Sequence, residues 1–476
     1  MPITLLLGAM YFGEACIALV VLSLYQFNKK RDALSFLSSR PGLVCVVGVL
    51  GFVVSAGVIL YQFQRHRLAN GKQFIKIGMM NLVFVILTIV PAELALRVLS
   101  VQSPGGTLLG RTLLYPRSWS TVAEEYTSVI DEASKKSTYL VYDDALGWTL
   151  GSSRRSQDGL YFSSVEGVRS GAIGTAMAKR SATYRIALLG DSFMFGEEVP
   201  FEDSLGHQLE IALGSEFQVL NFGVPGYGVD QMYLRYEKDV RRWNPDVVIL
   251  GFPDDDIARS MMVYPFIGRP HWLLPWSKPR FVFQEKGLAL LNVPTVPPER
   301  IFSVNSVQEL PFIRYDQYYC DCDWEQSHWK FFYQSYVFRS IISLYPRQEI
   351  PRDETSSETR RAIHREIFRS FVDKVKSAGS IPLISLFPLY EDYVDPKIRT
   401  YRVGAPILAE AGIDYFDFTS CLERVNPPDR FVRPEGGHYS RTGNEAIAQC
   451  LAKIVLGNRS SAQRRSQGKP NSPAVF

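Results

Sequence analysis

The residues most able to do chemistry are a serine and a histidine that lie far apart in the sequence. Ser192 ends a Gly-Asp-Ser triplet, and His438 has Glu435 three positions before it. A serine hydroxyl is a weak nucleophile until a base removes its proton, and a carboxylate can orient the imidazole base and stabilise its cation. His328 also has a carboxylate three positions earlier, but only His438 lies in a loop just before the last expected helix. These residue types predict attack by Ser192, with His438 as the base and Glu435 as the orienting acid.

Such an attack makes the carbonyl oxygen of the substrate negative, so the site also needs hydrogen-bond donors that point at this oxygen. The backbone N–H of Ser192 is one candidate, because the residue lies where a strand turns towards a helix. The N–H of Gly226 is a second candidate, because glycine allows close approach of the backbone. We therefore expect these two amides to form part of an oxyanion hole.

Strands and helices alternate from about residue 138 and would position these groups. Strands that are buried on both faces and separated by helices predict a parallel sheet with right-handed crossovers, whose carboxyl ends meet at one edge. The expected strands are Tyr184–Leu189, Phe217–Asn221, Val247–Gly251, Ile381–Phe387 and Asp414–Phe418. The expected helices lie near Phe201–Leu213, Asp230–Trp243, Glu358–Ser377, Arg402–Ala411 and Arg441–Leu456.

Four short motifs at these strand ends resemble those of the SGNH hydrolases, also called the GDSL esterase/lipase superfamily. The motifs are Gly190-Asp191-Ser192, the glycine-rich segment 221–228, the three aspartates 254–256 and the acid-x-x-His segment 435–438. They occur in the order of that superfamily and span about residues 185–456. The resemblance implies an α/β class domain of three layers, α/β/α and flavodoxin-like, with about five parallel strands and a serine esterase activity. The segments 146–148 and 167–169 are similar to the lead-in of membrane-tethered members.

The sequence departs from that superfamily at two positions. Glu435 stands where aspartate is usual and is one methylene longer. In the longer form of the third motif, Asp255 stands where an asparagine side chain is the third oxyanion donor, and in an alignment without the extra residues Pro253 stands there instead. An ionised Asp255 only accepts hydrogen bonds, whereas a protonated Asp255 could donate one. The three aspartates are also consistent with the N-terminal cap of a helix, or with a metal site for which the sequence identifies no further ligand. We predict no cofactor and no metal.

Three long apolar runs open the chain, at about Ile3–Phe27, Leu43–Phe63 and Ile77–Leu99. Each is long enough for a helix to cross ~30 Å of hydrocarbon, so three transmembrane helices are expected. Glu93 has Arg97 four positions later, which favours an ion pair at the membrane interface. Glu14 could be protonated, face the bundle or bind a ligand.

Charge alone does not orient the membrane helices. The two gaps between the runs hold four Lys or Arg residues each, and the arginines after the third run slightly favour a cytoplasmic large domain. The resemblance favours the opposite, because tethered members of the superfamily act on envelope or secreted glycans and lipids. We therefore expect a multi-pass protein of the cell membrane whose large domain is extracytoplasmic.

Composition gives a domain plan and excludes some partners. The formal net charge is only +4, and the tail after Gly457 carries four basic residues, so no basic face for nucleic acid is expected. The plan is a membrane anchor (1–100), a linker and lead-in segment (101–183), an SGNH hydrolase-like domain (184–457) and a disordered basic tail (458–476). An aromatic insert at about 261–347 is consistent with a lid, with an acyl-binding wall or with ordinary packing.

The six cysteines are too few for a disulfide scaffold. Cys320 and Cys322 are separated by one residue, which we expect to be too short for an easy bridge. Cys421 and Cys450 could pair in an oxidising compartment, whereas the cysteines of the apolar runs, Cys16 and Cys45, are expected to be apolar fillers.

Together these features predict a membrane-anchored serine esterase or deacylase that acts on an acyl ester of an envelope glycan or lipid. Two alternatives stay open. The acyl group could be transferred to a sugar hydroxyl, or the fold could bind without turnover because Asp255 replaces the asparagine. The sequence does not identify the acyl group, the oligomeric state or a protein partner.

Overall fold

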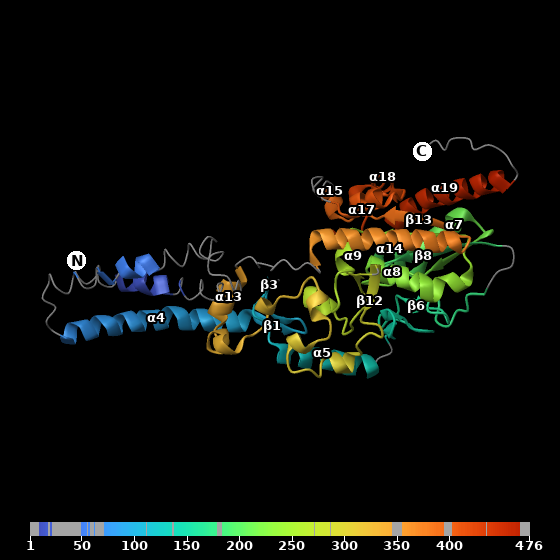
Figure 1. Cartoon of the computed structure of the whole chain (residues 1–476). Helices are drawn as coiled ribbons and strands as arrows, with labels where there is room; N and C mark the ends of the chain where they lie inside the picture. The colour runs from blue at the N-terminus through green and yellow to red at the C-terminus, as the bar shows by residue number, and fades with distance from the viewer. Residues whose placement is uncertain are drawn as a thin grey trace. The chain divides into compact units, whose positions relative to one another are not determined.

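The structure is a computed structural model of the whole chain, in which two units can be distinguished (Figure 1). The first contains Met1–Val122 and Cys320–Ile350, and the second contains Ala123–Tyr319 and Pro351–Phe476. About the last third of the aromatic insert therefore groups with the N-terminal unit. The residues described are 9–17, 20, 49–54, 56–57, 61, 71–110, 112–135, 138–178, 183–270, 272–285, 287–344, 355–394, 402–434 and 436–466.

A five-stranded parallel sheet forms the centre of the second unit, as predicted. Its strand order is β14-β13-β10-β8-β9, and every neighbouring pair is parallel. The strands β8, β10 and β13 are largely buried because apolar residues point to both faces, whereas the edge strand β14 is only partly buried. Their bounds are β8 (Tyr184–Gly190), β9 (Phe217–Asn221), β10 (Val247–Phe252), β13 (Ile381–Leu386) and β14 (Tyr415–Asp417).

Helices cover both faces of this sheet and give three layers. Alternate residues of β8 enter different cores: Ala187 and Leu189 pack with α8, α14 and α17, while Ile186 and Leu188 pack with α7 and α19. Figure 1 shows α14 and α19 running along the sheet. The prediction of an α/β domain with about five parallel strands is confirmed. The covering helices are α7 (Leu205–Leu213), α8 (Val229–Arg235), α14 (Ser357–Ser377), α17 (Gly404–Ala411) and α19 (Arg441–Ser466).

Smaller elements lie outside the central sheet, among them the two-stranded sheets β4-β5, β6-β7 and β11-β12. The helix α5 comprises Trp119–Lys135. The further strands are β4 (Leu140–Asp143), β5 (Gly147–Leu150), β6 (Phe162–Ser163), β7 (Arg169–Ser170), β11 (Arg280–Gln284) and β12 (Gly287–Leu291). The short helices are α6 (Ser192–Phe195), α9 (Asp255–Arg259), α10 (Pro265–Gly268), α11 (Pro298–Ile301), α15 (Glu391–Val394) and α18 (Thr419–Glu423).

The first unit contains the long helix α4 (Gly71–Leu99). Within the described residues, its part Asn81–Leu99 is the only helix long and apolar enough to cross a membrane. The first two expected spans lie largely outside the described residues, so a three-helix anchor stays a prediction. The remaining elements are β1 (Ser100–Ser103), β2 (Gly106–Leu109), β3 (Thr112–Leu113), α12 (Lys330–Tyr333) and α13 (Tyr336–Leu344).

Both acidic residues of the apolar runs have polar partners. The Arg97 side chain donates to the Glu93 carboxylate at 2.8 Å, so the predicted ion pair is confirmed. The side-chain amide of Asn81 donates to the Glu14 carboxylate.

Two expectations about the cysteines and the tail are corrected. Cys320 and Cys322 form a disulfide, because a turn of 3₁₀ helix at Asp321–Asp323 brings their Cα atoms to 5.1 Å. Cys421 pairs with Cys450, the pairing left open by the sequence. The last helix continues past Gly457 to Ser466. Arg459 explains part of this extension, because it pairs with Glu216 at 3.0 Å and stacks over aromatic rings of the sheet edge.

Candidate active site

Ser192 is the first residue of α6, a single helical turn directly after β8. The Asp191 side chain caps this helix by accepting the Phe193 N–H at 2.9 Å. Gly196 ends it in the left-handed conformation (φ 81°), which favours glycine. The N–H groups of Gly196 and Glu197 both donate to the Ser192 carbonyl at 3.0 Å. The chain therefore returns immediately to the side of Ser192.

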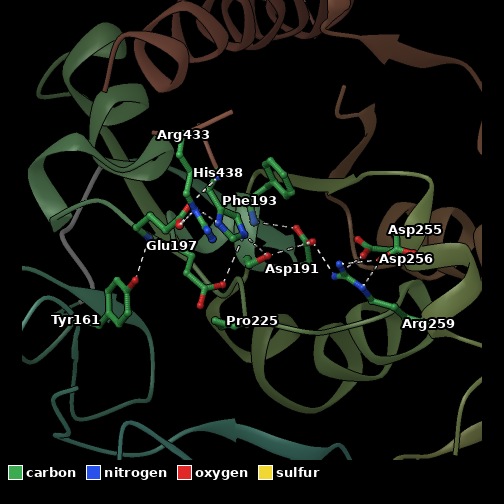
Figure 2. Close-up of polar contacts among 12 residues, drawn as sticks. Tyr161, Asp191, Phe193, Glu197, Pro225, Asp255, Asp256, Arg259, Arg433 and His438 are labelled. Atoms are coloured by element: carbon green, nitrogen blue, oxygen red, sulfur yellow. Dashed lines mark hydrogen bonds and ion pairs between the residues drawn. The ribbon is translucent and has the colours of Figure 1, made fainter. Parts of the chain in front are cut away.

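This return brings two adjacent carboxylates to the imidazole of His438 (Figure 2). The Ser192 Oγ lies 2.8 Å from His438 Nε2, within hydrogen-bond distance. On the other side of the ring, His438 Nδ1 lies 3.0 Å from Glu198 Oε2. Nδ1–H can thus donate to Glu198, which leaves Nε2 free to accept the proton of Ser192. The structure brings Ser192 and His438 together as the sequence analysis expects.

The carboxylate at Nδ1 belongs to Glu198 and not to Glu435, the acid expected from the spacing along the chain. Glu435 lies outside the described residues, and its assignment stays a prediction. Glu198 also accepts the backbone N–H of His438 at 2.7 Å and the Arg433 side chain at 2.7 Å. Burial opposes ionisation, but these hydrogen bonds and the one from the imidazole hold the pKa of Glu198 below its usual value. Glu198 is therefore a carboxylate suited to stabilise an imidazolium.

The backbone at Glu198 is unusual, since its φ is 69°, a region that non-glycine residues rarely adopt. Its N–H donates to the Tyr161 hydroxyl at 2.8 Å. Arg169, from the lead-in segment, stacks on Tyr161 and donates to the Val199 carbonyl at 3.1 Å. The segment 167–169 thus supports, through Arg169, the turn that carries Glu198. The sequence signal for this turn is Gly196 soon after the serine, followed by two glutamates.

The glycine-rich loop after β9 contributes Gly226 to the same cavity as Ser192 and His438. Gly226 has a φ of 81°, so its backbone conformation favours glycine. The loop is braced by Trp148, whose indole N–H donates to the Pro225 carbonyl at 3.0 Å. The Tyr227 hydroxyl in turn donates to the Trp148 carbonyl at 2.6 Å. The segment 146–148 therefore holds, through Trp148, the loop that carries the N–H of Gly226, the second expected oxyanion donor.

Asp255 lines the cavity, but its carboxylate pairs with Arg259 at 3.1 Å and also with Arg269. A carboxylate between two guanidinium groups accepts hydrogen bonds and is not placed to donate one to an oxyanion. Arg259 also pairs with Asp191 at 2.9 Å and Asp256 at 2.8 Å, as Figure 2 shows. Asp191 is therefore held by a hydrogen-bonded ion pair with Arg259 of α9. Burial and the nearby Asp191 charge raise the pKa of Asp256 well above its usual value.

Asp254 caps a helix, although not the helix that follows it. Its two carboxylate oxygens accept the N–H groups of Val403 and Gly404, at 2.9 and 2.8 Å, at the start of α17. The aspartates 254–256 thus form caps and ion pairs. Within the described ranges, no group of three or more His, Cys, Asp or Glu residues is arranged to hold a metal ion.

Glu197 is a functional candidate that only the tertiary structure identifies. Its carboxylate lines the cavity and lies 3.6 Å from His438 Nε2, on the side of the ring that faces Ser192. Burial raises the pKa of Glu197, while the nearby His438 opposes this effect. A carboxyl group at this position is within reach of an alcohol or a water that approaches the imidazole.

The cavity above these groups has a volume of about 820 Å³, large enough for a sugar or a lipid portion beside an acyl group. Its wall combines apolar with charged side chains. Trp272, Leu273 and Leu274 of the aromatic insert contribute to this wall, in agreement with one of the three interpretations left open for the insert. The apolar lining residues are Tyr139, Leu140, Phe193, Pro225, Trp272, Leu273, Leu274, Leu389 and Tyr390.

Comparisons with known proteins give only distant structural likeness. No protein-family model matches the chain, and a search of curated proteins finds no match. One similar solved structure comes from Desulfitobacterium hafniense and is described as a lipolytic protein of the G-D-S-L family. It has 14% sequence identity to this chain and a TM-score of 0.31. It covers 57% of this chain and 99% of its own. A lipase/acylhydrolase from Enterococcus faecalis has 15% identity, a TM-score of 0.29 and coverages of 58% and 97%. An acetylxylan esterase from Geobacillus stearothermophilus has 14% identity, a TM-score of 0.29 and coverages of 58% and 95%.

Proposed function

We propose that the protein is a serine esterase that cleaves acyl esters through an acyl-enzyme. The observation that carries this proposal is the hydrogen-bonded series from Ser192 Oγ to His438 Nε2 and from His438 Nδ1 to Glu198, at 2.8 and 3.0 Å. Such a series activates a serine for attack on a carbonyl carbon. Ser192 and His438 line an open cavity, so a substrate in this cavity can reach the Ser192 hydroxyl.

In the first half of the reaction, Ser192 Oγ attacks the ester carbonyl and its proton moves to His438 Nε2. The N–H groups of Ser192 and Gly226 would hold the oxygen that becomes negative. His438 then gives the proton to the leaving alcohol, and the acyl group stays on Ser192. In the second half, a water molecule gives a proton to His438 and its oxygen attacks the acyl carbon. His438 then returns this proton to Ser192 Oγ as the bond between Oγ and the acyl carbon breaks, and the carboxylic acid leaves.

The oxyanion hole proposed here has two backbone donors and no amide side chain. Removal of one oxyanion donor from a serine hydrolase costs roughly a hundred- to a thousandfold in rate. Asp255 cannot supply the third donor while it pairs with Arg259 and Arg269. We therefore expect a slow esterase, and the alternative of a binding protein without turnover is tested by the same experiment as the esterase.

Membrane anchoring and an extracytoplasmic site are further parts of the proposal. Asn81–Leu99 is long and apolar enough to act as an anchor. The disulfides Cys320–Cys322 and Cys421–Cys450 favour an oxidising compartment, because cytosolic thiols are kept reduced. An ester of an envelope glycan or lipid is the substrate class that such a location would offer.

Transfer of the acyl group to a sugar hydroxyl is a second candidate, favoured by Glu197. A carboxyl group 3.6 Å from His438 Nε2 could bind an acceptor hydroxyl beside the base that must remove its proton. Product analysis with and without added acceptor separates the two reactions. Hydrolysis releases free acid in both cases, whereas transfer yields an acylated acceptor.

A fluorophosphonate probe tests whether the serine is activated. The full-length protein in detergent should form a covalent adduct at Ser192, and Ser192→Ala should abolish this adduct. Ser204→Ala is a matched control, because Ser204 is also a buried serine near the start of a helix but lies outside the cavity described above. Failure of folded wild-type protein to react would reject the esterase and support the binding protein.

A further inference from the structure

The part of α4 that could cross a membrane exposes its apolar side chains. Leu87 is 65% exposed, Leu94 is 58% exposed and Val98 is 84% exposed. The apolar part of α4 that precedes Glu93, from Ile77 to Ala92, extends over about 24 Å at 1.5 Å per residue, most of the thickness of a hydrocarbon layer. These exposed apolar side chains are therefore expected to contact the acyl chains of a lipid bilayer.

A charged pair near the carboxyl-terminal end of α4 holds the start of α13. The Glu93 carboxylate accepts the N–H groups of Tyr336 and Val337 at 2.9 and 3.0 Å, and the Ser335 hydroxyl at 3.1 Å. A carboxylate that accepts the first N–H groups of a helix caps that helix, and its negative charge interacts favourably with the positive end of the helix dipole. In addition to its ion pair with Arg97, the Glu93 side chain therefore makes a tertiary contact with a segment more than two hundred residues later in the chain.

Arg97 contacts the same segment. Its guanidinium group donates to the Gln334 carbonyl and lies 4.7 Å from the centre of the Tyr336 ring. These contacts fix α13 at one level of α4, and Figure 1 shows the two helices together. Charged groups are costly in hydrocarbon and lie at the membrane–water interface. The level of Glu93 and Arg97 is accordingly that of the lipid headgroups, and α13 begins at this level.

The segment 329–344, which contains α12 and α13, has the character of an interfacial element. Phe331 is 85% exposed and Leu344 is 79% exposed, although both are large and apolar. Buried Tyr333, Phe338 and Ile342 form a small core beneath them. Aromatic side chains concentrate in membrane interfaces, where an apolar ring meets polar headgroups.

We propose that the segment 329–344 inserts into the headgroup–acyl boundary beside α4 and acts as a second contact with the lipid bilayer. A bilayer is the occupant because the segment is attached to the membrane-spanning helix at its interfacial charges, so lipid already lies next to it. The proposal rests on the membrane anchoring included in the proposed function, but not on the esterase chemistry.

Fluorescence quenching in vesicles tests the proposal. The full-length protein, with Cys16→Ser and Cys45→Ser, is reconstituted into vesicles of phosphatidylcholine and phosphatidylglycerol. An environment-sensitive fluorophore is attached to Phe331→Cys, and brominated acyl chains or aqueous iodide are used as quenchers. Ile211→Cys on α7, where Ile211 is 61% exposed, is the matched control, and Leu87→Cys on α4 reports the anchor. Leu344→Cys is a second probe of the segment if Phe331→Cys does not fold.

We expect the probes at Phe331 and Leu87 to be quenched by brominated lipid, and to be at least about fivefold less sensitive to iodide than the probe at Ile211. Lipid contact at Leu87 with full iodide access at Phe331 would overturn the interfacial segment while the anchor stands. Iodide access at both positions would overturn the segment and the anchor together. Protection at Phe331 that disappears on dilution among vesicles would identify a second copy of the chain as the occupant and also overturn the proposal. Fluorophosphonate labelling of the same samples reports the esterase site separately.

Discussion

The identity of the orienting acid can be tested by removing its charge while its shape is kept. In Glu198→Gln, the amide oxygen can take the place of Oε2 and still accept the N–H and Nδ1–H of His438. The amide nitrogen would then face Arg433, whose side chain is 62% exposed and can move away. The substitution therefore leaves the orientation of His438 and removes mainly the negative charge.

The size of the effect follows from the geometry. A unit charge about 4 Å from the imidazolium is worth about 4 kcal/mol at an effective dielectric constant of about 20. His438 and Glu198 are 16% and 21% exposed, and water at the site weakens their interaction. We expect a loss of about 2–4 kcal/mol of transition-state stabilisation, which corresponds to about a 30- to 1000-fold lower kcat/KM. Glu198→Ala also removes the hydrogen bonds that orient the ring, and should cost about 10⁴-fold.

The assay is hydrolysis of p-nitrophenyl acetate by the full-length protein in detergent, with the rate of fluorophosphonate labelling as a second measurement. Thermal unfolding of each variant controls for loss of the fold. Glu435→Gln is the matched comparison, and we expect it to change kcat/KM by less than about threefold, because Nδ1 already has a carboxylate partner. A Glu198→Ala enzyme of near wild-type activity, together with a large loss in Glu435→Gln, would refute the reasoning and restore the acid expected from the sequence.

Two further predictions concern stability. Burial raises the pKa of Glu197, so the folded state keeps its proton at pH values where the unfolded state has lost it, and stability falls as pH rises from the unfolded pKa to the folded pKa. Glu197→Gln should therefore unfold at a higher temperature than wild type at pH 8 but at a similar temperature at pH 4; an equal difference at both pH values would contradict this. Cys421→Ser opens a disulfide between residues 29 positions apart, which should cost about 3–4 kcal/mol and lower the unfolding temperature. Calorimetry measures both, and an unchanged transition in Cys421→Ser would show that the bridge does not limit stability.

The parallel sheet was predictable because the signal for it is local. The five strands are short apolar segments bounded by polar or glycine-containing turns, and four of them begin at the residue expected from the sequence. Strands of a parallel sheet have their carboxyl ends at one edge, so the proximity of Ser192 to the loop of His438 follows from the order of elements alone. The expected end of the last helix was wrong because the contacts of Arg459 join residues more than two hundred positions apart.

The acid at His438 could not be chosen from the sequence in this way. Spacing along the chain favours Glu435, whereas the carboxylate at Nδ1 is that of Glu198, which depends on a one-turn helix and a left-handed residue. The roles of the aspartates 254–256 likewise depend on arginines and backbone amides that arrive from other segments.

The sequence by itself determined the class of fold, the two groups that meet at its rim and an apolar run able to cross a membrane, because periodicity and residue type encode burial and local geometry. Tertiary structure decided which carboxylate faces which ring nitrogen and what Glu93 binds. Hydrogen bonds need positions defined to a few tenths of an ångström, and such positions are set by the packing of segments that are distant in the chain.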